Sequence, residues 1–401
     1  MLKEKNQRTA TLLAFALLPL SGFATDIYIP SLPSMGTDMH ISAIQVQLTL
    51  TVFLITYGTS QLFIGSILDS FGRYRMSLIA LFVFTISCVL IAVTHNIYLI
   101  YLMRAVHGIT VAFIVVAKRA LFVDIYKGKQ LQNYLSMFTI IWSAGPIVAP
   151  FIGGYFQNTF GWQSNFYFLG GLAAILFVLE LTYSGETLAK PVKFNVKRIA
   201  RVYADMIKTT SFSMGILILS FAYSMVIMYN MTGPYIIEHH LQLTPVIAGY
   251  CSLILGLAWM LGGFISKAVI SKPFYTKLSV NIALQVLFVG IMIVSLNFVS
   301  NLYSLVFFAF LIHVCAGFTY NNYFTYCLSK FPDNAATAGG LTGGAVYIIL
   351  SFLTYGVIKV FPAKDERNLS YSYLVFVLLS ALVMYILYRM NRRAVKLTSV
   401  Q

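Results

Sequence analysis

A carboxylate inside an apolar stretch is the first feature of this sequence that could do chemistry. Asp26 lies within an apolar run from residue 10 to about residue 33. A helix needs about 20 mostly apolar residues to cross a bilayer, so this run is long enough to span. A charged side chain within a span costs roughly 2.5–3.5 kcal/mol on insertion scales, and it must be paired, hydrated or protonated. We therefore expect Asp26 to bind a proton or a charged partner.

The expected partner of Asp26 is Arg104. Asp26 lies seven residues from the outer end of its run, which is about 10 Å along a helix. Arg104 lies about as deep in an antiparallel run from residue 97 to 124. His107 follows nearby and can titrate near neutral pH, or it can hydrogen-bond as a neutral group. Asp26, Arg104 and His107 are therefore the candidate proton-coupling residues, and either Asp26 or His107 could carry the proton.

The composition indicates the elements that must position these side chains. The 401 residues are 59% hydrophobic and only 10% charged, with a mean hydropathy of +0.81. Soluble domains contain about 25% charged residues, so a bilayer is the solvent that fits. Backbone polar groups in lipid must be bonded within their own segment, which makes each apolar run a helix. We expect an all-α polytopic membrane protein with twelve transmembrane helices near residues 10–33, 44–68, 76–94, 97–124, 131–157, 164–183, 211–237, 245–270, 276–298, 300–329, 336–361 and 369–390.

A polar break divides the expected helices into two six-helix bundles. The bundles cover residues 1–183 and 211–401, and residues 184–210 form a cytoplasmic linker in which 196–207 could be an amphipathic helix on the membrane surface. With the N-terminus inside, only three of the 27 Lys and Arg residues fall outside, and one lies within a span. Excess basic residues collect in cytoplasmic loops, so both termini are expected to be cytoplasmic. The formal charge of +15 is spread over every second loop, which argues against a nucleic-acid partner.

Two motifs contain glycine at defined spacing. In the loop after the second helix, a glycine would allow close packing, and an aspartate could bond to a helix end or an arginine. The residues of this loop motif are Gly65, Leu68, Asp69, Gly72, Arg73 and Arg75. The fifth helix has two prolines that bend it and glycines that allow a close seam. The residues of this helix motif are Gly145, Pro146, Pro150, Gly153 and Gly154.

These motifs resemble those of a known transporter family. The loop motif resembles the major facilitator signature between helices 2 and 3, and the helix motif resembles the exporter signature of drug/proton antiporters. SGFATDIYIPSLP around Asp26 and RAVHG from Arg104 resemble the bicyclomycin/chloramphenicol resistance (Bcr/CflA) family, although His107 stands where that family usually has Gln. The resemblance implies the major facilitator fold, a monomer, a loop motif that acts as a gate, and a cavity lined by helices 1, 4, 7 and 10.

The remaining polar residues are weaker candidates for a functional role. Lys118, Arg119 and Asp124 are expected at the inner surface, and the family-like GETL segment from Gly185 is expected to carry no chemistry. The second half shows no buried carboxylate comparable with Asp26, and the four cysteines suit small core residues. Neither a metal site nor a cofactor is expected. Candidate substrate-cavity residues, for which bonding between helices is the alternative, are Tyr28, Trp142, Tyr223, Asn230, His313, Tyr320 and Asn321.

The function expected from the resemblance is proton-coupled export of drugs or small amphipathic or polar molecules across the inner membrane. The alternatives are a dedicated exporter of a metabolite such as a siderophore or other metallophore, a proton-driven importer, and a membrane sensor that does not transport. An enzyme is not expected, because the sequence shows no nucleophile–base arrangement, metal cluster or phosphate-binding loop. The expected partners are a small-molecule substrate, protons and the lipid bilayer, with the proton gradient as the energy source.

Overall fold

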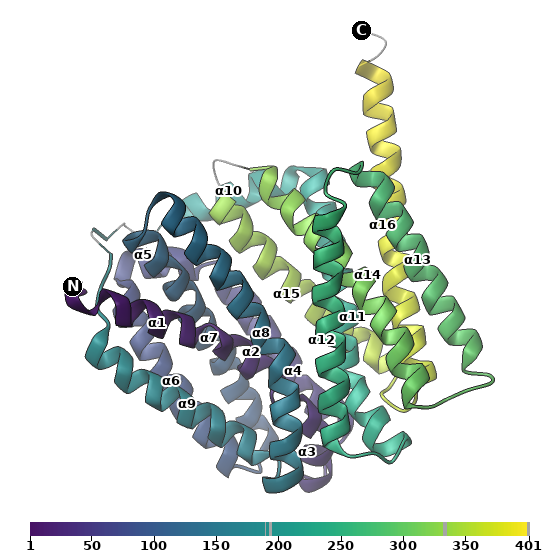
Figure 1. Ribbon diagram of the computed structural model, residues 1–401, viewed down its shortest axis with the longest axis horizontal. Coiled ribbons are helices and arrows are strands. Elements are labelled where there is room, and N and C mark those ends of the chain that lie inside the picture. Colours follow the sequence, from purple (N-terminus) through teal and green to yellow (C-terminus); the bar gives the residue numbers. More distant parts are fainter. Residues whose placement is uncertain (189, 192–194, 332–334, 399–401) are drawn as a thin grey trace. The chain divides into compact units, whose positions relative to one another are not determined.

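The computed structural model describes residues 1–188, 190–191, 195–331 and 335–398. Every regular element in this part of the chain is a helix, as expected (Figure 1). The chain forms two compact units, each with its own packing. Unit 1 comprises Met1–Lys197 and Leu243–Leu253, and unit 2 comprises Arg198–Gln242 and Ile254–Gln401. The main division therefore lies within the predicted linker, and six spanning helices in each half stay a prediction.

The helices of unit 1 follow one another with short connections. They are α1 (Gln7–Leu17), α2 (Pro19–Asp26), α3 (Leu32–Asp38), α4 (Ala43–Gln61), α5 (Ile64–Phe71), α6 (Arg73–Val93), α7 (Ile97–Ile125), α8 (Gly128–Phe160) and α9 (Gln163–Tyr183). Within this unit, α7 packs against α4 and α6, α6 packs against α9, and α2 packs against α8. The linker helix α10 (Val196–Lys208) begins in unit 1 and continues into unit 2.

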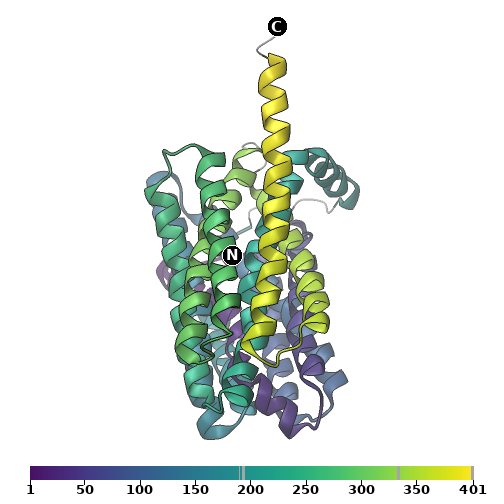
Figure 2. The same ribbon diagram turned by 90° about the vertical axis from the view of Figure 1, so that its right-hand side faces the viewer.

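Unit 2 contains the remaining long helices. They are α11 (Thr210–Tyr235), α12 (Pro245–Ala268, whose first residues belong to unit 1), α13 (Phe274–Ser295), α14 (Leu302–Ser329), α15 (Ala335–Val360) and α16 (Glu366–Thr398). Within the unit, α11 packs against α14, α15 and α16. The C-terminal end of α16, drawn in yellow, extends beyond the other helices of this unit (Figure 2).

The lengths and composition of the helices make this a multi-pass membrane protein. In the described part of the chain, ten spans are long and apolar enough to cross a membrane. The number rises to eleven if α4 and α5, which meet at a bend of 57°, form one span. The helix expected near residues 131–157 is present as α8. Twelve spans and cytoplasmic termini stay predictions.

The first span runs from Glu4 to Asp38 as one candidate span, as expected, but the helix within it is interrupted. Between Glu4 and Asp38 the chain forms α1, α2, a 3-10 turn at Ile29–Ser31, and α3. Proline lacks the amide hydrogen that a continuous helix needs, and each of the last three pieces has a proline among its first residues. The break places Asp26 at the last residue of α2 and so fixes the position of the candidate carboxylate.

Candidate functional site

Asp26 and Arg104 lie together in the interior of unit 1. Asp26 is 4% exposed and Arg104 is fully buried. The Arg104 guanidinium donates a hydrogen bond through Nη1 to the carbonyl oxygen of Ala24, at 2.8 Å, and interacts electrostatically with Asp26. This contact between α7 and α2 brings the two charges near each other, and their common depth in the membrane stays a prediction.

Aromatic rings enclose the Arg104 guanidinium. Its Cζ lies 4.5 Å from the ring centroid of Tyr28 and 4.5 Å from that of Phe53. Nε and Nη2 are buried without a hydrogen-bond partner among the described residues. Burying these two donors without partners costs free energy. Attraction between the cation and the ring faces offsets part of this cost, by about 2 kcal/mol for a desolvated contact. Arg104 is thus a buried positive charge held mainly by α2 and two rings.

His107 continues this chain of contacts along α7. Its Nδ1 lies 3.4 Å from Arg104 Nη1, and its Nε2 lies 3.4 Å from the sulfur of Cys88 on α6. Because Arg104 can only donate, Nδ1 must accept, and the assigned proton is then on Nε2, facing Cys88. The ring also packs against Phe84, with centroids 4.5 Å apart. This arrangement fits a neutral imidazole that hydrogen-bonds as a glutamine would.

The glycines of the helix motif hold α8 against the broken first span. A Cβ at Gly145 would lie 2.8 Å from the carbonyl oxygen of Pro19, and one at Gly153 would overlap that of Ile27. A Cβ at Gly154 would lie 2.6 Å from the carbonyl oxygen of Pro245, in the segment of α12 that belongs to unit 1. The predicted close seam is confirmed, and it packs against the residue that directly follows Asp26.

The loop motif forms an ion-pair cluster around Arg73. Arg73 Nη2 bonds Asp69 Oδ1 at 2.7 Å, and Nη1 forms an ion pair with Asp124 of α7. Gly72 has φ +95°, which L side chains rarely adopt, and it separates α5 from α6. The expected packing role of Gly65 is wrong, because a Cβ there would meet nothing within 4 Å. The bonding expected for Asp69 is confirmed.

The GETL segment carries more than the sequence analysis expected. The Glu186 carboxylate accepts hydrogen bonds from the backbone amides of Arg73 and Tyr74, both at 3.2 Å. These are the first residues of α6, where unpaired amides and the helix dipole favour a negative charge. The next residue, Thr187, donates to Asp124 Oδ2 at 2.6 Å. The segment, at the start of the linker, therefore has a structural role at the loop motif, and the expectation that it carries no chemistry stays a prediction.

A buried ion pair between α7 and α9 escaped the sequence analysis. Lys118 Nζ lies 2.6 Å from Glu180 Oε2, and their side chains are only 3% and 1% exposed. Lys118 is thus not an inner-surface residue as expected. Glu180 interrupts the apolar run FVLELTY, which is the signal that could have revealed it.

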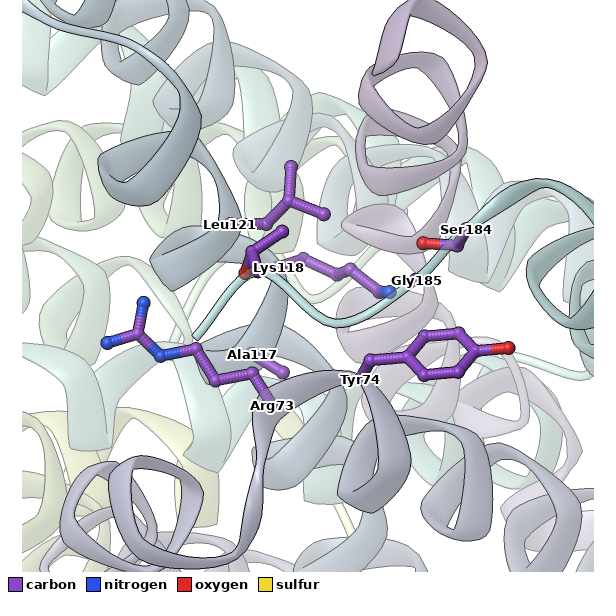
Figure 3. A pocket seen from close by; sticks show the side chains of 8 residues that line it. Arg73, Tyr74, Ala117, Lys118, Leu121, Ser184 and Gly185 are labelled. Atoms are coloured by element: carbon purple, nitrogen blue, oxygen red, sulfur yellow. The ribbon is translucent and has the colours of Figure 1, made fainter. Parts of the chain in front are cut away.

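Lys118 also borders a small cavity of about 10 Å³, enough for one water molecule. In Figure 3, the Lys118 side chain extends toward Ser184 and Gly185, whereas the Arg73 guanidinium points away from them. The cavity is lined by Arg73, Tyr74, Ala117, Lys118, Leu121, Ser184, Gly185 and Thr187.

Two predicted cavity residues of unit 1 have different outcomes. Tyr28 is 1% exposed, and its hydroxyl lies 3.0 Å from Thr49 Oγ1, so it is a core residue beneath Arg104 in this structure. Trp142 lies on α8, and its side chain falls outside the described part of the chain.

In unit 2, the structure separates residues that the sequence placed on one helix face. His313 is buried, and its Nε2 lies 3.4 Å from the hydroxyl of Tyr373 on α16, so the expectation that it lines a cavity is wrong. The amide of Asn321, an exposed residue, donates to the carbonyl oxygen of Gly317 at 2.9 Å. Asn230 is half-buried on α11.

Tyr223 and Tyr320 belong to an aromatic cluster instead. Their ring centroids lie 5.8 Å apart, and Trp259 of α12 lies 5.6 Å from Tyr223 and 5.2 Å from Tyr320. Tyr347 of α15 completes the cluster at 5.7 Å from Tyr223. All four rings are half-buried. Trp259 and Tyr347 could not be selected from the sequence, because nothing in their local pattern distinguishes them from other aromatic residues of spanning helices.

Unit 2 does contain a buried carboxylate, contrary to expectation. Glu366 is 1% exposed at the start of α16, and its Oε2 lies 3.1 Å from Nδ1 of His240. His240 ends the π-helical turn Ile236–His240 that follows α11. This contact joins the ends of two helices that are far apart in the sequence.

The fold and these motifs are those of a known transporter class. Residues 14–355 match the Major Facilitator Superfamily, and the chain belongs to this family. Among solved structures, the chain resembles the crystal structure of the nucleoside transporter NupG with a TM-score of 0.72, covering 96% of this chain and 99% of that one. The sequence identity of 12% makes this a likeness of fold alone.

Sequence relatives include proteins named for drug resistance. The multidrug resistance protein MdtL of Shewanella oneidensis is 25% identical over 362 residues, which are 87% of this chain and 90% of the relative. The bicyclomycin resistance protein homolog of Haemophilus influenzae is 34% identical over 191 residues, 46% of this chain and 47% of the relative. The uncharacterized MFS-type transporter YdgK of Bacillus subtilis is 26% identical over 345 residues, 84% and 85% of the two chains. The family predicted from the motifs is confirmed.

Proposed function

We propose that this transporter is a proton-coupled secondary exporter of drugs or other small amphipathic or polar molecules. It would work by alternating access in the inner (cytoplasmic) membrane, as a monomer of twelve spanning helices with both termini in the cytoplasm. The proton gradient would drive it, without a bound cofactor. The observation that carries the proposal is the buried Asp26 at the break in the first span, beside Arg104 and against the glycine seam of α8.

The coupling follows from competition at Asp26. A carboxylate in the interior of a spanning unit is stable when it faces a positive charge or when it holds a proton. Substrate bound from the cytoplasmic side would compete for Asp26 or Arg104 and favour proton loss, and a proton from outside would then favour substrate release. Two global states, each preferred by one ligand, are sufficient for exchange. The membrane potential adds about 2.3 kcal/mol per charge for each 100 mV.

Asp26, rather than His107, is assigned the proton in this proposal. His107 is already engaged by Arg104 on one nitrogen and by Cys88 on the other. A protonated imidazole would place a second positive charge beside Arg104 and would lose the hydrogen bond that Nδ1 accepts. His107→Gln should therefore keep coupled transport.

Support for an amphipathic substrate comes from the aromatic cluster of unit 2. The rings of Tyr223, Trp259 and Tyr320 are half-buried, so part of each ring is open to contact with another molecule. Aromatic side chains combine a large apolar face with a polar tip, and they are common in small-molecule sites. The names of the relatives make drugs the first substrates to test.

The test is a transport assay with purified protein in liposomes that carry a pH gradient. Internal pH is followed with an enclosed dye as bicyclomycin and other candidate drugs are added. The proposal expects substrate-dependent proton movement in the wild type and in His107→Gln. Movement that disappears in His107→Gln would assign the proton to His107, whereas drug movement without any proton movement would refute coupled export.

A further inference from the structure

The linker helix α10 has two distinct sides. Residues of a helix are placed every 100°, so Lys197, Arg201 and Lys208 lie along one side. The apolar residues of α10 cover the other side and form a broad stripe that begins next to the basic one. The sequence of α10 contains four basic residues and one acidic residue, Asp205, which forms an exposed ion pair with Lys208 at 3.3 Å.

Only part of the apolar stripe is used in packing. Met206 is 2% exposed, and Tyr203 is half-buried. These two residues therefore face the protein. In contrast, Val196 and Ile207 are 48% and 53% exposed. They are eleven residues apart, which places them on one edge of the helix, and the exposed Ala200 and Ala204 lie between this edge and the basic residues.

The chain keeps the end of α10 close to the start of a candidate membrane span. The spanning helix α11 begins at Thr210, only two residues after Lys208. An extended chain advances at most about 3.6 Å per residue, so the end of α10 lies within about 7 Å of the start of this span. A helix with an exposed apolar edge and an adjacent basic edge is the form that binds at a lipid interface.

We propose that α10 binds anionic lipid headgroups, with Lys197, Arg201 and Lys208 on the phosphates and with Val196 and Ile207 in the boundary region below them. Charge complementarity selects this partner, because anionic leaflets attract basic segments near the membrane. The proposal does not depend on which substrate the protein moves or on whether protons drive it.

The test compares amide hydrogen exchange of the full-length protein in nanodiscs of phosphatidylcholine alone and in nanodiscs that also contain phosphatidylglycerol. The amides of Val196–Lys208 should exchange more slowly in the anionic discs, by about fivefold for each basic residue in contact. Lys197→Gln/Arg201→Gln should remove most of this difference. The control Lys127→Gln/Lys129→Gln removes the same charge from exposed positions elsewhere and should keep it.

Two further measurements separate this proposal from its rivals. High salt should abolish the difference in the wild type, because it screens charges near the surface. Val196→Ser/Ile207→Ser should speed exchange of α10 in both kinds of disc, since the apolar edge would no longer be held. Equal exchange of wild-type α10 in the two lipids would overturn the proposal, as would an equal loss of the difference in the control variant.

Discussion

The buried pair Lys118–Glu180 gives the sharpest prediction about stability. Replacing Lys118 with Met removes the positive charge and leaves Glu180 in the interior with its partner gone. Both side chains are almost completely buried, so water cannot replace the lost ammonium group. Breaking a buried pair from one side costs about 3–5 kcal/mol, whereas replacing both members with uncharged residues is often close to neutral.

We therefore expect Lys118→Met to lower the free energy of unfolding by about 3–5 kcal/mol. The double variant Lys118→Met/Glu180→Met should recover most of this loss. Unfolding is measured in mixed micelles with rising fractions of denaturing detergent, followed by circular dichroism. A double variant that is as unstable as the two single losses added together would refute the reasoning, because it would show that the two charges do not interact.

Two of the three other predictions have matched controls. Gly153→Ala should destabilise the protein by several kcal/mol, since the added methyl group overlaps the Ile27 carbonyl oxygen. In the control Gly171→Ala the methyl group meets only open space, so stability should be unchanged or rise by up to about 1 kcal/mol. Both variants are compared in thermal melts. Glu186→Gln should lower the unfolding free energy by about 1–2 kcal/mol by weakening the cap of α6, and Glu4→Gln at an exposed position should not. Failure of either contrast would contradict the packing or capping described for that site. His107→Gln should retain substrate-dependent proton movement in the liposome assay, as argued above.

Much of the fold follows from the pattern of apolar runs. Long apolar runs in a chain with few charged residues must lie in lipid. A helix satisfies the backbone polar groups of such a run, so the helices appear where expected. The interruption of the first span is harder to predict from the sequence. Helices tolerate single prolines, and the combined effect of Pro19, Pro30 and Pro33 depends on what packs beside them. The bend between α4 and α5 could not be predicted either, because no proline lies at this point of the sequence.

The site was predictable where a charge stands alone in an apolar run. Asp26 and Arg104 could be matched by depth, because two antiparallel helices have a common origin at the membrane surface. Glu180 also stands alone in an apolar run, so the same rule selects it. Glu186 was not predictable as a cap, because its bonds to the first amides of α6 depend on how the end of α9 approaches a helix more than 100 residues earlier.

The position of His313 shows that packing contacts in the second half of the chain could not be predicted from the sequence either. Helical spacing correctly places His313 near Tyr320 along α14, but spacing alone cannot say which neighbouring helix each side chain meets. His313 faces Tyr373 of α16, whereas Tyr320 faces Trp259 of α12. Only the packing of unit 2 separates the core side chain from the half-buried cluster.

The most direct test of the account compares Asp26→Asn with the wild type in liposomes with a pH gradient. Asn keeps the size of the side chain but cannot exchange a proton, and Asp205→Asn at an exposed position of α10 provides the control. The account predicts that substrate-dependent proton movement is lost in Asp26→Asn, that the protein remains folded, and that Asp205→Asn behaves as the wild type. Proton movement that persists at the wild-type rate in Asp26→Asn would contradict the claim that this carboxylate couples proton flow to export.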